Sequence, residues 1–361
     1  MASLPRTFDE HPLTWLASES TSGPGPRIFE SLPPSAKRAI HEAYKRYVHD
    51  LEVVKTALKS STETATIDNH DFLWAWLCVN TRCIHYSLNN ADRTRSLKDI
   101  DLTLCPIIDF ANHTIKEELT AQVIRNGNSA LEFFSAGTAM KKGDEIFLRY
   151  GNHNNAVLLA EYGFTISRSE QPSKLAVGEN DTVDGGEINV DDVIEMLFEE
   201  KSGQWRKDIL KSRGYWGDWT LHSSPTPAHP SYRILPALRL LHLSQPTPDE
   251  EAVLGSWTDA ASNLNAWEMM VLGRQQTVSH QNELSVSGTM RVVCERVMAR
   301  GEHGLNELYE LEQSILTLTP EASGDTDWFS STIRCATILW KEEYEVANAV
   351  LESIERGDPL E

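Results

Sequence analysis

The chain has 361 residues, a formal net charge of -20 and a hydrophobic fraction of 40% that includes 10 Trp. This composition is typical of a globular protein long enough for two domains of ordinary size. The acidic balance argues against nucleic acid as the main partner, because phosphate binding needs a basic stripe. An acidic surface instead accelerates encounters with basic protein segments, although the charge is also explained by solubility alone.

No apolar run approaches the roughly 20 residues that span a bilayer. The first residues also lack the charged-then-apolar layout of a secretory signal. We therefore expect an intracellular protein, cytoplasmic or nuclear, with no membrane partner. The five cysteines form no CxxC pair, which fits reduced thiols and argues against a structural metal site.

The N-terminal part alternates between loop-like and helical patterns. Residues 1–27 are rich in Ser, Pro and Gly, and we interpret them as a flexible arm. Pro33-Pro34-Ser35 is typical of a helix start, and apolar residues at helical spacing run from Ile40 to Leu58. A polar loop at 60–66 ends this helix. Residues 72–79 are apolar on all sides and predict a buried helix.

From Leu102 onward the pattern favours strands. The apolar run 104–108 predicts a short buried strand. Residues 121–125 and 129–134 read as two strands around Asn126-Gly127, a dipeptide suited to a tight hairpin turn.

A turn at 142–144 precedes an alternating strand over 145–150. Residues 156–162 then predict a short helix that Gly163 stops.

Beyond about Asp184 the periodicity becomes helical. A proline-rich connection at 223–230 interrupts this part, and Gly301 is positioned to stop a helix. Helices are predicted over 191–200, 232–243, 285–300, 305–318 and 328–354.

Two segments contain the residues that predict chemistry. The first is Cys-Pro-Ile-Ile-Asp-Phe-Ala-Asn-His over 105–113. The second runs over 142–164, from Lys-Gly-Asp-Glu through Arg-Tyr-Gly-Asn-His-Asn-Asn to Tyr-Gly-Phe. Each short motif alone is weak, since a lone Asn-His or Tyr-Gly is usually a hydrogen-bonded turn. In this order and spacing they resemble the signatures of SET-domain methyltransferases, in the branch of the Rubisco large-subunit and ribosomal-protein lysine methyltransferases. Trp74-Ala-Trp76 and Asn80-Thr-Arg82 resemble the upstream segment of that branch.

The resemblance implies an α+β fold, with a partial SET β-fold and helical insert over 28–182. An all-α substrate-binding domain like that of Rubisco methyltransferases is expected over 183–361. The implied activity is S-adenosyl-L-methionine-dependent N-methylation of a lysine on a non-histone protein. Tyr150 is the implied catalytic residue. The implied cofactor-binding residues are Arg82, Asp109, Phe110, Ala111, Asn112, His113, Tyr162, Gly163 and Phe164.

Lysine methylation needs a neutral amine in line with the methyl group. A free lysine has a pKa of about 10.4, so the site must desolvate its ammonium and orient it. An aromatic channel does this without a metal or a covalent nucleophile. Asp109 and His113 could also be metal ligands, but they lack a closed set of partners.

The family's opening strand pair with its Gly-x-Gly loop has no counterpart in the sequence. Gly23-Pro24-Gly25 matches the Gly-x-Gly pattern but lies in the proline-rich arm. The chain is then a truncated gene model, a protein whose arm covers the gap, or a non-catalytic module that binds protein partners. Protein-histidine methylation is a further alternative. For the enzyme we expect a monomer that acts on a basic, ribosomal or translation-related protein.

Overall fold

The computed structural model describes residues 7–17, 24–59, 67–85, 102–126, 130–135, 137, 139–167, 186–201, 204–244, 259–318 and 327–360. Two compact units make up the chain. The first comprises 1–184 with 310–339, and the second comprises 185–309 with 340–361. The predicted boundary at 182/183 lies outside the described residues. The predicted second domain, 183–361, differs from this division because residues 310–339 belong to the first unit.

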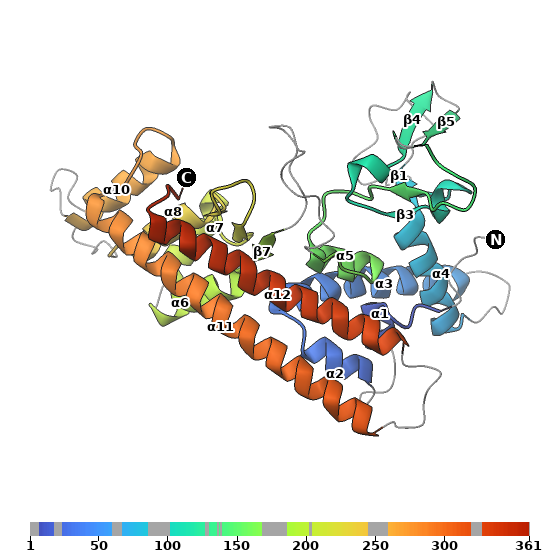
Figure 1. Ribbon diagram of the computed structural model, residues 1–361. Helices are drawn as coiled ribbons and strands as arrows, with labels where there is room; N and C mark the ends of the chain where they lie inside the picture. Colours follow the sequence, from blue (N-terminus) through green and yellow to red (C-terminus); the bar gives the residue numbers. More distant parts are fainter. Residues whose placement is uncertain are drawn as a thin grey trace. The chain divides into compact units, whose positions relative to one another are not determined.

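The first unit contains a small helical core. Its helices include α1 (Pro12–Ala17), α2 (Pro24–Glu30), α3 (Pro34–Lys59), α4 (Asn69–Arg82) and α5 (Asn155–Tyr162). Helix α3 packs against α1, α4 and α5 (Figure 1). Ala43, Tyr47 and Leu51 of α3 are buried against Leu73 and Leu77 of α4. These are the stripe and the buried helix that the spacing predicted, while the predicted loop at 60–66 lies outside the described residues.

The expectation of a flexible arm over 1–27 does not hold for the residues described there. Leu13 and Trp15 of α1 are only 1% and 5% exposed, and the Trp15 indole donates to the carbonyl of Asp9 at 2.8 Å. The Ser, Pro and Gly content wrongly predicted flexibility here, because burial of two apolar side chains is enough to hold one helical turn in place. Residues 1–6 and 18–23 lie outside the described part.

Among the described residues of this unit, three short ladders form the β part. Strands β1 (Ile84–His85) and β2 (Leu102–Thr103) are antiparallel, as are β4 (Gln122–Asn126) and β5 (Ala130–Phe134). Strands β3 (Asn112–His113) and β6 (Phe147–Leu148) are parallel. The predicted antiparallel pairing is confirmed, and residues 127–129 between the two strands lie outside the described residues. The strand predicted over 145–150 is reduced to β6.

The predicted buried strand over 104–108 is wrong. Leu104 and Ile107 are 56% and 75% exposed, and a 3-10 turn occupies Ile108–Phe110. Pro106 has no N–H for a ladder, and Ile107 adopts a φ of 87°. The turn then delivers the chain to β3.

Helix α5 begins and ends as predicted. The Asn154 side chain accepts a hydrogen bond from the backbone N–H of Val157, which caps the helix start. Gly163 follows the last turn at a φ of 81°, the left-handed conformation that glycine adopts without strain.

The second unit is mainly helical around a large core. Its helices include α6 (Asp191–Glu200), α7 (Gln204–Arg213), α8 (Ile234–Leu241) and α10 (Asp259–Val271). Trp219 and Trp267 are fully buried at its centre. A three-stranded antiparallel sheet that the pattern did not indicate joins β7 (Glu187–Asn189), β8 (Thr220–His222) and β9 (His229–Pro230). Strands of two or three residues are too short to show a period of two.

The predicted stop at Gly301 is wrong, because α11 runs without interruption over His280–Leu318. It lies antiparallel to α12 (Asp327–Arg356) (Figure 1). A Cβ at Gly304 would stand 2.2 Å from the Trp340 ring, so glycine here serves close helix packing. No helix in the described part of the chain has the length and apolar character of a membrane crossing.

Candidate active site

Strands β3 and β6 bring the two sequence motifs together. Asn112 pairs with Phe147 and His113 with Leu148 in parallel register. The Asn112 side-chain amide donates to the Glu145 carboxylate at 2.5 Å. The end of the first motif is therefore held against the turn and strand of the second.

Tyr150, the implied catalytic residue, follows β6 and is fixed at both ends. Its backbone N–H donates to Nδ1 of His113 at 3.1 Å, and its hydroxyl donates to the carbonyl of Ala111 at 2.8 Å. Its ring centroid lies 5.1 Å from that of His113 and 5.0 Å from that of Tyr162.

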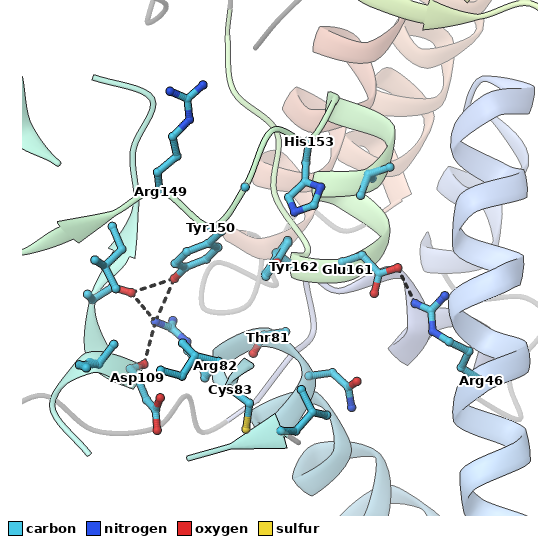
Figure 2. Close-up of a pocket in the computed structure, with 18 of the residues that line it drawn as sticks. Arg46, Thr81, Arg82, Cys83, Asp109, Arg149, Tyr150, His153, Glu161 and Tyr162 are labelled. Carbon is cyan, nitrogen blue, oxygen red and sulfur yellow. Dashed lines mark hydrogen bonds and ion pairs between the residues drawn. The ribbon is translucent and has the colours of Figure 1, made fainter. Parts of the chain in front are cut away.

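Arg82 organises the loop before β3. Its Nη1 donates to Oδ1 of Asn112 at 3.1 Å and, with longer contacts of 3.4–3.5 Å, reaches the carbonyls of Asp109 and Ala111 and the Tyr150 hydroxyl oxygen (Figure 2). Arg82 is the last residue of α4, where the helix dipole also favours a cation. The guanidinium thus holds the loop, a role that the sequence did not assign to it.

Tyr162 and Phe164 stand on either side of Gly163, with ring centroids 6.1 Å apart. The Phe164 ring lies 5.8 Å from His113. A Cβ on Gly163 would meet the His11 ring at 3.0 Å. The absence of a side chain at Gly163 therefore serves both the left-handed turn and the fit of His11.

Two cavities adjoin around these residues. The smaller has a volume of about 240 Å³, and the larger one of about 1180 Å³. Both are lined by Thr81, Arg82, Tyr150 and Tyr162. The smaller is also lined by Phe8, Asn112, His113 and Phe164.

The larger cavity has charged walls. Arg46 of α3 and Glu161 of α5 form an ion pair beside Tyr162 (Figure 2). Glu42 and Asp50 of α3 also line it, and the Asp50 carboxylate accepts from the Trp76 indole at 2.8 Å. Figure 2 shows Arg149 on the strand side of the cavity and His153 next to Tyr162.

Burial keeps the ring groups neutral at pH 7. It lowers the pKa of His113 to about 4, helped by the positive charge of Arg149 and by His153. Burial also raises the pKa of the Tyr150 and Tyr162 phenols. Neutral His113 accepts the Tyr150 N–H on Nδ1, which leaves its proton on Nε2.

Asp109 is buried beside the larger cavity. Burial raises the pKa of its carboxyl group, against the backbone N–H of Cys105 and the charge of Arg82. Among the described residues, no hydrogen-bond partner reaches its buried Oδ1. This atom is therefore available to a donor on a bound molecule.

The structure brings most of the sequence-predicted residues together. Asp109 and Ala111 line the larger cavity, and the smaller is lined by Arg82, Asn112, His113, Tyr150, Tyr162 and Phe164. Phe110 is 41% exposed; it and Gly163 line neither cavity.

Sequence reasoning missed several residues of the site. Thr81 lines both cavities and directly precedes Arg82, and Glu145 accepts the Asn112 amide and stands in the quoted Gly-Asp-Glu turn. Proximity to a motif could have indicated both. Glu161 had the same signal, because it lies within the second motif directly before Tyr162. Phe8 and Arg46 had none, because their places depend on how distant segments pack.

The two motifs meet in a mixed α+β unit, where Asn112, His113 and the aromatic residues wall one cavity, as the resemblance to SET-domain proteins implies. The chain is 30% identical over 244 residues to "Ribosomal lysine N-methyltransferase set11" of Schizosaccharomyces pombe, covering 67% of this chain and 51% of that protein. It is 24% identical over 306 residues to "SET domain-containing protein 4" of Mus musculus, covering 82% of this chain and 61% of the relative.

Among solved structures, Rubisco LSMT bound to sinefungin and monomethyllysine matches with a TM-score of 0.50 and 16% identity, over 97% of this chain and 69% of that chain. This likeness concerns the fold. No protein-family model matches the chain. The chain belongs to the SET-domain lysine methyltransferase family. It spans about half to three fifths of the length of the curated relatives described above.

Proposed function

We propose that the protein is an S-adenosyl-L-methionine-dependent protein-lysine N-methyltransferase acting on a non-histone protein. The observation that supports this best is the common cavity wall of Asn112, His113, Tyr150 and Tyr162. These residues come from both motifs, and hydrogen bonds fix Tyr150 between them. The relative from Schizosaccharomyces pombe is named as a ribosomal lysine methyltransferase, which supports the same activity.

The residues present fit the cofactor. Bound S-adenosyl-L-methionine would supply an activated methyl group on its sulfonium. Aromatic rings in the smaller cavity suit a flat heterocycle, and the unpartnered Asp109 Oδ1 suits a hydroxyl or amino donor. At about 240 Å³ the smaller cavity lies below the roughly 300–1,000 Å³ of whole ligand sites. It would therefore hold part of the cofactor, and the lining shared with the larger cavity would leave room there for the rest.

The larger cavity suits a lysine side chain. Its wall carries the carboxylates of Glu42, Asp50 and Glu161, which attract an ammonium group, alongside the cations of Lys45, Arg46, Arg82 and Arg149. Tyr150 and Tyr162 lie further along the wall, and their raised pKa values keep them uncharged. An amine beside two neutral rings loses hydration without gaining a counter-charge, which favours loss of its proton.

The substrate we propose is a basic segment of a ribosomal or translation-related protein, met in the cytoplasm or the nucleus by a monomeric enzyme. The net charge of -20 favours encounters with such a segment. Histidine methylation remains the alternative acceptor chemistry, which analysis of the methylated amino acid distinguishes.

The first test is calorimetric titration of the purified chain with S-adenosyl-L-methionine. We expect micromolar binding that Asn112→Ala abolishes, because the Asn112 side chain lines the cavity and is positioned by Arg82. Asn348→Ala, on α12 in the second unit, is the matched control and should bind normally. No binding by folded wild-type protein would contradict the proposal.

The second test is transfer of a labelled methyl group to a ribosomal-protein fraction. Mass spectrometry then identifies the acceptor. Methyllysine is expected, and methylhistidine would replace the proposed acceptor chemistry with the alternative.

A further inference from the structure

The segment before α1 contributes a side chain to the candidate cofactor site. Phe8 lines the smaller cavity together with Tyr150, Tyr162 and Phe164. These three residues come from the second motif, more than a hundred positions later in the sequence. Phe8 closes the cavity from a part of the chain that the motifs do not cover.

Phe8 is held rigidly in this place. Its ring is partly buried and packs against the core of α3 and α4. Its carbonyl accepts hydrogen bonds from the backbone N–H of His11 at 2.9 Å and from the Thr14 hydroxyl at 2.8 Å. A wall fixed in this way costs little entropy when a ligand binds.

His11 packs between the Phe8 segment and the Tyr162–Phe164 turn on the opposite wall of the cavity. Its side chain is 2% exposed and meets the Phe8 ring edge-on at 6.4 Å between centroids. On its other side the ring lies against Gly163, between Tyr162 and Phe164. The positions of Phe8 and of the Tyr162–Phe164 turn are therefore coupled through one buried side chain.

The lining of the smaller cavity selects a flat, uncharged ring with polar edges. Aromatic faces stack on heterocycles, and Asn112 and His113 offer hydrogen-bonding groups at the margin. Arg82 also lines the smaller cavity, but its Nη1 is hydrogen-bonded to Oδ1 of Asn112. The amino-acid end of the cofactor carries both a carboxylate and an ammonium, which lose hydration among aromatic rings. The larger cavity offers partners for both, guanidinium groups and carboxylates.

We propose that Phe8 is a wall of the adenine subsite, so that residues 7–17 form part of the cofactor pocket. This inference rests on the proposed function. The purine ring then stacks against Phe8, and the methionine part of the cofactor points to the larger cavity.

The test is calorimetric titration with S-adenosylhomocysteine and with adenosine, using wild type, Phe8→Leu and Phe8→Tyr. Leucine keeps apolar bulk but removes the ring, and we expect about tenfold weaker binding of both probes. Tyrosine restores the ring and should bind within about twofold of wild type. Phe72→Leu is the matched control, since Phe72 packs against the same core but lines neither cavity.

Circular dichroism and thermal unfolding verify that each variant is folded. If wild type binds and Phe8→Leu binds equally well, the inference is overturned while the proposed function stands. If Phe8→Leu loses S-adenosylhomocysteine binding but binds adenosine as wild type does, the assignment of Phe8 to the adenine subsite is overturned. If Phe72→Leu weakens both probes as much as Phe8→Leu, the effect comes from the core, and the inference is also overturned. Failure of wild type to bind either probe overturns the proposed function as well.

Discussion

At the scale of single residues, the Tyr150 hydroxyl shows how the site limits its own chemistry. It donates to the Ala111 carbonyl and faces the Arg82 guanidinium, and burial raises the pKa of the phenol. A phenol that stays protonated orients an amine through its oxygen and does not act as a strong base. In the proposed reaction the lysine proton must therefore leave to solvent or to another group.

Tyr150→Phe should lower the rate of methyl transfer about a hundredfold while cofactor binding changes by less than about threefold. The variant loses one hydrogen bond, with a net stability cost of about 1 kcal/mol. Single-turnover transfer and calorimetry measure the two effects separately. Tyr309→Phe, at a side chain that is 64% exposed, is the control. A transfer rate within about threefold of wild type would remove Tyr150 from its proposed role.

His11 makes stability depend on pH. Burial lowers its pKa to about 4, against a small opposing contribution from the Glu161 backbone. Above pH 6.5 the imidazole is neutral in both folded and unfolded chains and contributes no pH dependence. Between pH 6.5 and 4 the unfolded chain binds a proton that the folded chain does not, so the free energy of unfolding falls, by about 3 kcal/mol at pH 4.

In His11→Asn this component of the acid sensitivity should disappear. The asparagine carbonyl can still accept the Leu13 N–H that Nδ1 accepts in the wild type. Urea unfolding at several pH values from 7 to about 4.5 measures the difference. If the free energy of unfolding falls equally steeply with pH in the variant and the wild type, His11 does not titrate as described.

At the scale of elements, local sequence was sufficient to predict a helix where its capping residues and apolar periodicity lie within one segment. Helix α5 illustrates this, because Asn154 and Gly163 define its ends within a few residues. Strand β3 pairs with a segment more than thirty residues away, and no local pattern specifies that pairing. Six of the ten residues predicted from the motifs nevertheless line one cavity. Phe8 could not be found in this way, since its role exists only in the folded unit.

Glycines in α11 show why the predicted helix end at Gly301 failed. Helix propensity alone disfavours glycine by about 1 kcal/mol relative to alanine, so two glycines three residues apart favour a break. A Cβ at Gly304 would collide with Trp340, whose side chain is only 5% exposed. Close approach of the two helices therefore outweighs propensity in the second unit.

Gly304→Ala and Gly288→Ala should change stability in opposite directions. Gly304→Ala is expected to lower the free energy of unfolding by about 1–3 kcal/mol through overpacking against Trp340. Gly288 lies in the same helix with no atom within 4 Å of its added Cβ, so alanine there should stabilise by about 0.5–1 kcal/mol. Denaturant titrations compare the two. Stabilisation by both would mean that α11 and α12 do not approach as closely as the Trp340 contact requires.

At the scale of the whole molecule, net charge and local chemistry have separable effects. A charge of -20 acts over the Debye length, about 10 Å at 0.1 M salt, and changes the encounter rate with a basic partner. The proposed adenine subsite lies between aromatic rings, so binding there should depend little on ionic strength. Salt should therefore weaken the capture of a basic acceptor without weakening cofactor binding.

Raising sodium chloride from about 50 to 500 mM should reduce methylation of a lysine-rich acceptor at limiting concentration roughly tenfold, through its association rate. The affinity for S-adenosylhomocysteine should change less than twofold over the same range. Glu42→Gln removes one carboxylate of the larger cavity but only one unit of twenty from the net charge. If it reduces capture as strongly as salt does, the acceptor is recognised by the cavity itself. If Glu42→Gln reduces capture only slightly, the charge of the whole surface accelerates the encounter with the acceptor. This is the outcome we expect.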